Sequence, residues 1–429
     1  MRRLSLALIL GAALLPSNAA ASGAPACSAT VSDADAAAMA VGQAAAGDVV
    51  CLQDGTYGLL TLHGGTEAPS VTVTALHPGK VTAAGAMLEG SHVTLSGLRL
   101  TAQVTIATGS AGMTVDRNLL IGRGKGSGNY GVFVCPAEPP DHCDDVSITR
   151  NRFQGRFDED AIRANVYHDG PDPDHNGLLV EGNEFTGNVE YGGHNDVFQS
   201  VWVGDHLVIR RNYIHDFGGQ GIFVKDQAPA IDGLVIDDNL IVRQDRPCDP
   251  RSLCPTWQLS PLQVFGPIAH GSISHNTIWT SRKGSASSGG PVLLRDPGWS
   301  KVTYSDNVIV DGAREATAQV SGSGNTRCSQ TTGPWVALPG SAADCSPPFR
   351  DPAHGDYTQA GGRGVTWKVA DQTYGPVPTV RAVAAAPRAV HHKDSSDWGW
   401  FIWLVTAALA AAILATMAAG RVATWSRRR

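Results

Sequence analysis

The stretches VSITRNRF, at residues 146–153, and LVIRRNYI, at residues 207–214, are two copies of one eight-residue pattern. In both, apolar and polar residues alternate before a central Asn, and an apolar residue returns two positions after it, which is the period of a β-strand. A divergent copy over residues 93–100 has Leu98 in place of the Asn. Further copies centre on Asn118, Asn183, Asn239, Asn276 and Asn307. The chain therefore repeats a unit of strand, turn and strand.

The spacing of the copies indicates a solenoid. Successive centres, counted from Leu98 to Asn307, lie between 20 and 37 residues apart, as expected for stacked coils with loops of variable length. Asn tolerates the left-handed backbone that a tight turn requires, and stacked Asn amides can hydrogen-bond from coil to coil. We therefore expect the central asparagines to form a structural ladder.

A second series of strands lies between these copies. Its apolar residues are Val132, Ile162, Phe198, Ile222, Leu262 and Val292, each followed two positions later by Val134, Ala164, Ser200, Val224, Val264 and Leu294. If both sets point inward, the residues between and beside them point outward from one parallel sheet. The predicted fold is all-β: a right-handed parallel β-helix over residues 27–375, with the segment 28–46 as a candidate helical cap.

The composition excludes several classes of protein. A hydrophobic share of 42% rules out a disordered chain, and the 49 Gly and 25 Pro follow no collagen period. Charged residues make up only 17% and the formal net charge is −6 at pH 7, so the chain has no basic surface for nucleic acid. A folded, turn-rich protein with no nucleic-acid partner is expected.

Both ends carry targeting signals. Residues 1–26 have the basic, apolar and small-residue layout of a secretory signal. Residues 398–420 contain no charge and are long enough to span a bilayer, with tryptophans at their front edge and arginines after them. We expect a single-pass cell-surface protein: residues 376–397 form a linker, residues 398–420 a transmembrane helix, and residues 421–429 a basic cytoplasmic tail.

Eight cysteines lie in the part expected to be exported, where disulfides persist. Their number alone leaves many connectivities open. Neighbours in sequence suggest four bridges: Cys27 with Cys51, Cys135 with Cys143, Cys248 with Cys254, and Cys328 with Cys345.

Two motifs resemble a known superfamily. The stretch AGDVVCLQDGTY, at residues 46–57, is similar to the opening of exported β-helix proteins of the pectate lyase-like superfamily, which includes the chondroitinase B and alginate lyase family. The stretch FRDPAHGDY, at residues 349–357, looks like the close of the same fold. The resemblance implies a parallel β-helix that binds acidic polysaccharide on the outer face of its parallel sheet. The superfamily also contains hydrolases, epimerases and non-catalytic adhesins, so the motifs indicate fold more than activity.

Three neighbouring coils of the second strand series concentrate polar residues. Eliminative cleavage of a uronic-acid polymer needs a cation on the carboxylate, a base for the proton beside it, and an acid for the leaving oxygen. We expect Arg163 to pair with the carboxylate, Lys225 to act as base, and His194 to donate the proton. Lys225 matches the lysine base of the chondroitinase B family in residue type. The expected substrate-binding residues are Asp160, Asn165, Asp196, Gln199, Gln220 and Asp226.

Several alternatives stay open at this point. The run Asp158, Glu159 and Asp160 is a candidate calcium site, although an acidic loop end is the simpler interpretation. Asp160 and Asp196 could instead form the carboxylate pair of a glycoside hydrolase. A third hypothesis is a non-catalytic glycan-binding or adhesive protein that uses the same outer face.

Overall fold

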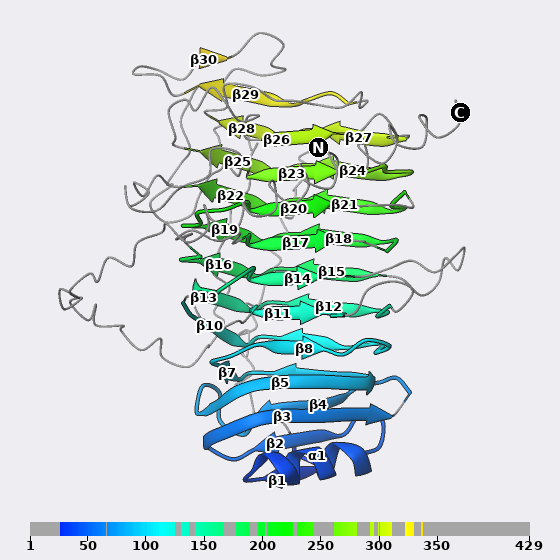
Figure 1. Cartoon of the computed structure of the whole chain (residues 1–429), viewed down its shortest axis with the longest axis vertical. Coiled ribbons are helices and arrows are strands. Elements are labelled where there is room, and N and C mark those ends of the chain that lie inside the picture. The colour runs from blue at the N-terminus through cyan, green and yellow to red at the C-terminus, as the bar shows by residue number, and fades with distance from the viewer. Residues whose placement is uncertain are drawn as a thin grey trace, which may run out of the picture. The chain divides into compact units, whose positions relative to one another are not determined.

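The computed structural model shows a stack of coils that begins at α1 and continues to β29 (Figure 1). The chain divides into two units, residues 1–377 and 378–429, and all described residues belong to the first. The structure describes residues 26–65, 67–124, 130–136, 142–165, 177–188, 196–201, 204–225, 230–243, 261–280, 292–295, 299, 301–310, 322–329 and 336–337. The predicted signal, linker, transmembrane helix and tail lie outside these residues.

The strands form three columns, and each full coil contributes one strand to each column. The first column is an eleven-stranded parallel sheet. Its strands, in order of pairing, are β1 (Ala29–Val31), β2 (Val49–Leu52), β4 (Val71–Ala75), β6 (Val93–Ser96), β9 (Thr114–Asp116), β12 (Val146–Thr149), β15 (Leu178–Glu181), β18 (Leu207–Arg210), β21 (Leu234–Asp237), β24 (Gly271–Ser274) and β27 (Val302–Ser305).

The second column follows the asparagine turns. It consists of β3 (Gly55–Gly65), β5 (Val81–Ser91), β7 (Arg99–Leu100), β10 (Leu119–Arg123), β13 (Arg152–Arg156), β16 (Glu184–Thr186), β19 (Tyr213–His215), β22 (Leu240–Arg243), β25 (Thr277–Thr280), β28 (Val308–Val310) and β29 (Thr326–Ser329). A short strand, β30 (Val336–Ala337), pairs with β29 in the antiparallel sense. The long strand β5 also pairs with the first strand of the third column.

The third column closes each coil and carries the candidate site. Its strands are β8 (Val104–Ile106), β11 (Val132–Val134), β14 (Ile162–Ala164), β17 (Phe198–Val201), β20 (Ile222–Lys225), β23 (Leu262–Phe265) and β26 (Val292–Arg295). Every described pairing in the three columns except β29 with β30 is parallel. The predicted parallel β-helix is confirmed. Its right-handed sense stays a prediction, supported by the strong preference for right-handed crossovers between parallel strands.

A helix caps the first coil, as the sequence suggested. The helix α1 (Ala34–Gln43) begins at Asp33, whose carboxylate accepts the backbone N–H of Ala36 at 2.8 Å. Its buried residues Ala37 and Val41 belong to the hydrophobic core. The helix therefore covers apolar surface that a terminal coil would otherwise expose. Among the described residues, no helix is long and apolar enough to cross a membrane.

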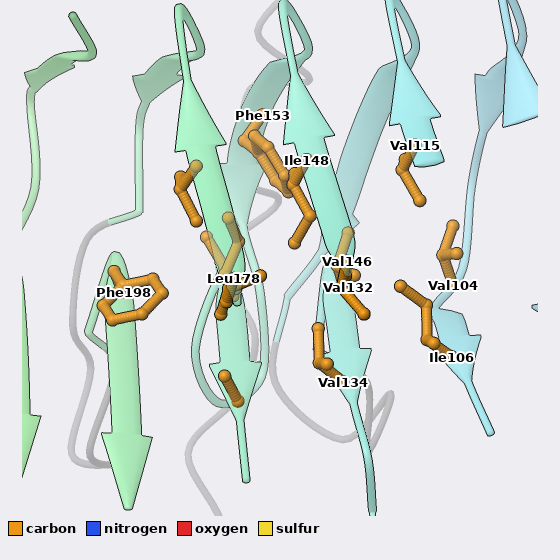
Figure 2. Packing of buried hydrophobic residues seen from close by; sticks show 14 of the residues in the cluster. Val104, Ile106, Val115, Val132, Val134, Val146, Ile148, Phe153, Leu178 and Phe198 are labelled. Atoms are coloured by element: carbon orange, nitrogen blue, oxygen red, sulfur yellow. The ribbon is translucent and has the colours of Figure 1, made fainter. Parts of the chain in front are cut away.

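The core runs along the inside of the coils. In the third column, Val132 pairs with Ile162, and the pairing continues through Phe198, Ile222 and Leu262 to Val292. All six side chains are at most 1% exposed. Figure 2 shows Val132, Val134 and Phe198 pointing to the inside together with residues of the other two columns. Because this register matches the apolar alignment, the predicted outward positions are confirmed as well.

The asparagine ladder is present at the turn between the first and second columns. The seven asparagines from Asn118 to Asn307 are fully buried, and the Nδ2 of Asn151, for example, donates to Oδ1 of Asn183 at 3.1 Å. Asn325 extends the ladder by one residue, which the sequence pattern did not show. The left-handed residue is the one before the Asn, such as Arg150 with φ 54°. We expected the Asn itself there, but its amide is needed inside, where it satisfies buried backbone groups.

Two of the four predicted disulfides are confirmed, Cys27 with Cys51 and Cys135 with Cys143. The pair Cys248 and Cys254 lies outside the described residues, as does Cys345. Cys328 lies in β29.

Candidate functional site

One row of side chains runs along the outer face of the third column. The strand register brings Phe133, Arg163, Gln199, Phe223 and Gln263 to the same position on five successive coils. Neighbouring parallel strands lie about 4.8 Å apart, which is close to the length of one sugar unit. The row therefore places Arg163 and Gln199 between two aromatic rings, with Gln263 beyond the second ring. Gln199, Phe223 and Gln263 are only 6–7% exposed, so Phe133 and Arg163 are its more accessible members.

Arg163 is the second side chain of this row and is held in place by its neighbours. Its Nη1 donates to Oε1 of Gln199 and lies 3.5 Å from Oδ2 of Asp160. Its Nε donates to Oδ1 of Asn165 at 3.3 Å. The Arg163 side chain is 21% exposed, so a guanidinium with fixed orientation reaches the surface. A planar, oriented guanidinium is suited to a carboxylate ligand.

Asp160 supplies the negative charge behind Arg163. It is 1% exposed, and burial raises the pKa of its carboxyl to about 7. The hydrogen bond from the Asp196 backbone and the positive charge of Arg163 lower this pKa, whereas Glu159 raises it. The carboxyl can therefore change protonation near neutral pH, and the net charge around Arg163 changes with it.

Asp160 and Asp196 also belong to a stack of buried side chains just before the third column. Oδ1 of Asp160 accepts the backbone N–H of Asp196 at 2.9 Å, and Oδ1 of Asp196 accepts the backbone N–H of Gln220 at 2.9 Å. All three residues are at most 2% exposed. Their predicted role in binding substrate stays a prediction. In this structure their side chains lie beneath the surface, where each carboxylate holds the following coil.

Lys225 lies on the same outer face as Arg163, but not beside it. It pairs with Val201 on the preceding coil and with Phe265 on the following one. Lys225 therefore lies two coils further along the stack than Arg163, and two residues beyond the row on its own strand. Its side chain is exposed. The two cations are separated by about 10 Å along the stack and about 7 Å along the strand. Both long side chains point outward from the sheet that the sequence predicted.

The remaining predicted residues divide into three cases. Asn165 and Gln199 are brought to Arg163, as described above. Gln220 lies in the buried stack. His194 and Asp226 lie outside the described residues.

The candidate calcium ligands do not form a metal site within the described residues. No group of three or more His, Cys, Asp or Glu side chains in that part of the chain is placed to hold a metal ion. Asp160 is buried, and its oxygens already face the Asp196 backbone and Arg163. Because the donor set does not fit, no step of the mechanism below uses a metal, and calcium binding stays a sequence prediction.

Sequence reasoning missed Tyr130, which lies on the coil before Arg163. Its ring packs against Phe133 with the ring centroids 4.6 Å apart. Burial raises the pKa of the Tyr130 phenol, and the charges of Asp160 and Glu159 add to this, whereas Arg163 opposes it. Tyr130 lies two residues before β11, and Asp160 lies two residues before β14. An alignment of the coils at the position two residues before each strand could therefore have identified Tyr130.

Comparisons with known proteins give structural neighbours only. No protein-family profile matches the chain, and no curated protein matches it. Among the solved structures that are similar is a mannuronic acid specific polysaccharide family 6 lyase from human gut microbiota, with 14% identity over 71% of this chain and 92% of that one, at a TM-score of 0.38. An alginate lyase from Paenibacillus sp. str. FPU-7 has 13% identity over 68% and 96%, at 0.39.

A protein of another class is also similar. It is PfbA, a surface adhesin of Streptococcus pneumoniae, with 12% identity over 72% of this chain and 90% of that one, at a TM-score of 0.29. Polysaccharide lyases thus occur among the neighbours, as the sequence resemblance predicted. All three TM-scores are below 0.5, so these similarities are too distant to indicate a function.

Proposed function

We propose that the outer face of the third column binds an acidic polysaccharide along its row of side chains, and that Arg163 holds the carboxylate of one sugar unit. The observation that carries this proposal is the fixing of the Arg163 guanidinium by Asp160, Asn165 and Gln199 within an outward row. Fixed side chains lose little entropy on binding. Phe133 on the preceding coil can pack against a sugar ring.

The reaction we propose is β-elimination. Arg163 neutralises the carboxylate, and a base removes the proton on the carbon next to it. The electron pair of that C–H bond forms a carbon–carbon double bond as the bond to the glycosidic oxygen breaks, and that oxygen takes a proton. The products are an unsaturated uronate at one new end and a hydroxyl at the other.

Lys225 remains the proposed base, with His194 as the proposed proton donor. An amine serves as a base through the lone pair of its nitrogen, which accepts the proton from carbon. Lys225 and Arg163 start about 10 Å apart along the stack. Their side chains are long and point to the same side, so both can reach one sugar unit held over the Gln199 coil.

The test is ultraviolet absorbance of the unsaturated product after the protein is mixed with alginate, pectate and glycosaminoglycans. We expect one of these polymers to give the signal and Lys225→Ala to reduce it by about a hundredfold or more, the usual contribution of a general base. The matched control is Lys80→Ala, which removes an exposed lysine from the segment before β5. New reducing ends without this absorbance would contradict elimination.

The structure favours binding without turnover as the second candidate over a hydrolase. The carboxylates of Asp160 and Asp196 accept backbone hydrogen bonds beneath the surface, so they do not face a bound glycosidic bond as a hydrolytic pair must. In contrast, the partly exposed Arg163 and Phe133 could bind sugar without any base. Retained binding with no product from any of the polymers would support this candidate.

We also propose that the protein is exported and anchored at the cell surface, with the β-helix outside and residues 421–429 in the cytoplasm. The two disulfides support an oxidising location. The uncharged segment 398–420 supports a membrane anchor. Protease added to intact cells should degrade the β-helix, and deletion of residues 398–429 should release it into the medium.

A further inference from the structure

A small open pocket lies beside the row, at the corner between the second and third columns. It has a volume of about 10 Å³, room for roughly one water-sized group, and lies between the end of β10 and Tyr130. Ile121, Tyr130 and Phe157 supply apolar surface, and Thr101 and Arg123 also line it. None of the described residues that line the pocket is acidic. It is a positively charged notch with apolar walls, suited to one anionic substituent.

Two arginines lie next to each other at this corner. Arg123 pairs in register with Arg156 of the next coil, and the N–H of Gly124 donates to the Arg156 carbonyl oxygen at 2.8 Å. The coils are so close here that a Cβ at Gly122 would lie 2.2 Å from that same carbonyl oxygen. Arg123 is exposed and makes no ion pair with any residue that the structure describes.

The notch is continuous with the row that contains Arg163. Tyr130 lines the notch, its ring packs on Phe133, and Phe133 is the register neighbour of Arg163. The phenol of Tyr130 is near enough to Arg163 for the guanidinium to influence its pKa. Asp160 and Glu159 both influence this phenol, and the charge of Asp160 is compensated by its pairing with Arg163. A sugar bound over Phe133 can therefore direct a substituent into the notch.

We propose that this notch is a second anion subsite, in which Arg123 binds the carboxylate of an acidic sugar unit whose ring lies on Tyr130 and Phe133. The inference rests on the proposed function for the polymer and shares Phe133 with it, but Arg123 and Tyr130 have no part in the binding or cleavage proposed there. It would make the protein select chains in which acidic units are adjacent, since Arg163 and Arg123 then bind two carboxylates of one chain.

The experiment is fluorine NMR of the full-length chain labelled with fluorotyrosine, with the Tyr130 signal assigned by Tyr130→Phe. Sodium glucuronate is the probe, and glucose is the neutral control. We expect glucuronate to shift the Tyr130 signal saturably and glucose to leave it unchanged. Arg123→Gln should weaken glucuronate binding by roughly fivefold or more, the equivalent of about 1 kcal/mol.

Two charge-matched variants separate the possible outcomes. Arg117→Gln removes an exposed arginine from an asparagine turn and should leave the glucuronate affinity unchanged. Arg163→Gln should preserve saturable binding at the notch, even if the polymer no longer binds or no polymer is cleaved. A Tyr130 signal that does not shift, or one that shifts equally in Arg123→Gln, would overturn the proposal. Loss of polymer binding alone would overturn only the proposed function.

Discussion

Two ladders of buried polar side chains hold the coils together, and they differ in chemistry. The asparagine ladder extends from Asn118 to Asn325 and uses neutral amides that donate and accept. The shorter stack before the third column has Asp160, Asp196 and Gln220 at matching positions, and its two carboxylates accept backbone N–H groups. Neutral amides alone are sufficient to hold the coils together at the asparagine turns. Burying ionisable groups in the second is costly, since burial disfavours the charged form.

The difference indicates what each region contributes. The asparagine ladder repeats at each turn from Asn118 to Asn325, so it stabilises most of the stack. The acid stack coincides with the coils that carry Arg163 and Gln199, and Oδ2 of Asp160 faces Arg163 at 3.5 Å. We infer that the acid stack orients the site, whereas the asparagine ladder maintains the fold. Substitutions in the two ladders should therefore have different consequences.

The largest effect is expected from Asn183→Ala in the middle of the asparagine ladder. The Asn183 side chain donates to the Ile148 carbonyl oxygen and to Oδ1 of Asn212, and it accepts from the N–H and the Nδ2 of Asn151. Removing it leaves buried backbone groups without partners, which should lower the free energy of unfolding by about 3 kcal/mol. Urea unfolding followed by circular dichroism measures this change.

The matched control is Asn325→Ala at the end of the same ladder. Asn325 accepts from Asn307 and donates to the Tyr304 carbonyl oxygen, but it is partly exposed, so water can replace its contacts. Its loss should cost well under half as much. Equal losses from both substitutions would contradict the idea that position within the ladder matters.

A change at Asp160 should affect pH dependence more than stability. Because burial raises the pKa of Asp160 to about 7, the folded state binds the proton more tightly than the unfolded chain does. Its contribution to stability is present below pH about 4 and is lost as the pH rises through about 7. Asp160→Asn keeps an oxygen that accepts the Asp196 N–H, but its amide does not ionise. The asparagine should therefore cost the protein no stability as the pH rises from about 4 to about 7.

Asp160→Ala provides the comparison, because it removes the acceptor as well as the charge. Chemical unfolding at pH 5 and pH 8 should show Asp160→Ala less stable than wild type at both values. Asp160→Asn should be at least as stable as wild type at pH 8. The assignment of the pH effect to this carboxyl would be wrong if Asp160→Asn and wild type had parallel pH profiles.

The smallest effect is expected at His215, which lies on the outer face of the second column. Its imidazole lies beside two carboxylates and pairs with them when it is protonated. Its Nδ1 lies 3.1 Å from Oδ2 of Asp216, and its Nε2 lies 3.3 Å from Oε1 of Glu184. Burial lowers the pKa of His215, but the hydrogen bonds and charges of Asp216 and Glu184 outweigh it, so the net pKa is raised.

Protonated His215 therefore stabilises the folded state. This contribution is complete below pH about 6.5 and is lost as the pH rises through the raised pKa. His215→Gln should destabilise the protein by about 1 kcal/mol at pH 5.5 and by less at pH 8.5, as measured by thermal unfolding. A destabilisation that grows with pH would contradict this account.

Much of the fold could be predicted because its determinants are local and repeat. The alternation around each Asn predicted the first two columns, and the apolar alignment from Val132 to Val292 predicted the register of the third. The first coils were missed: β3 and β5 each run through eleven residues without an asparagine turn, so they offer no copy of the pattern.

The site was less predictable, because burial depends on neighbours from other coils. Sequence alternation gave the outward directions of Arg163, Gln199 and Lys225 correctly. It could not show that Asp160 and Asp196 turn inward, since their partners are backbone N–H groups of the following coil. An acidic residue just before a strand looks the same in sequence whether it faces substrate or the main chain.

The measurement that tests the central claim most directly is the affinity of one oligouronate for wild type, Arg163→Gln and Arg117→Gln at low salt. Arg163→Gln should weaken binding about tenfold or more, since a charged hydrogen-bond pair contributes roughly 1.5–3 kcal/mol. Arg117→Gln should bind as wild type does, because Arg117 lies at an asparagine turn between the other two columns. Unchanged affinity in Arg163→Gln, or equal losses in both variants, would contradict a carboxylate site centred on Arg163.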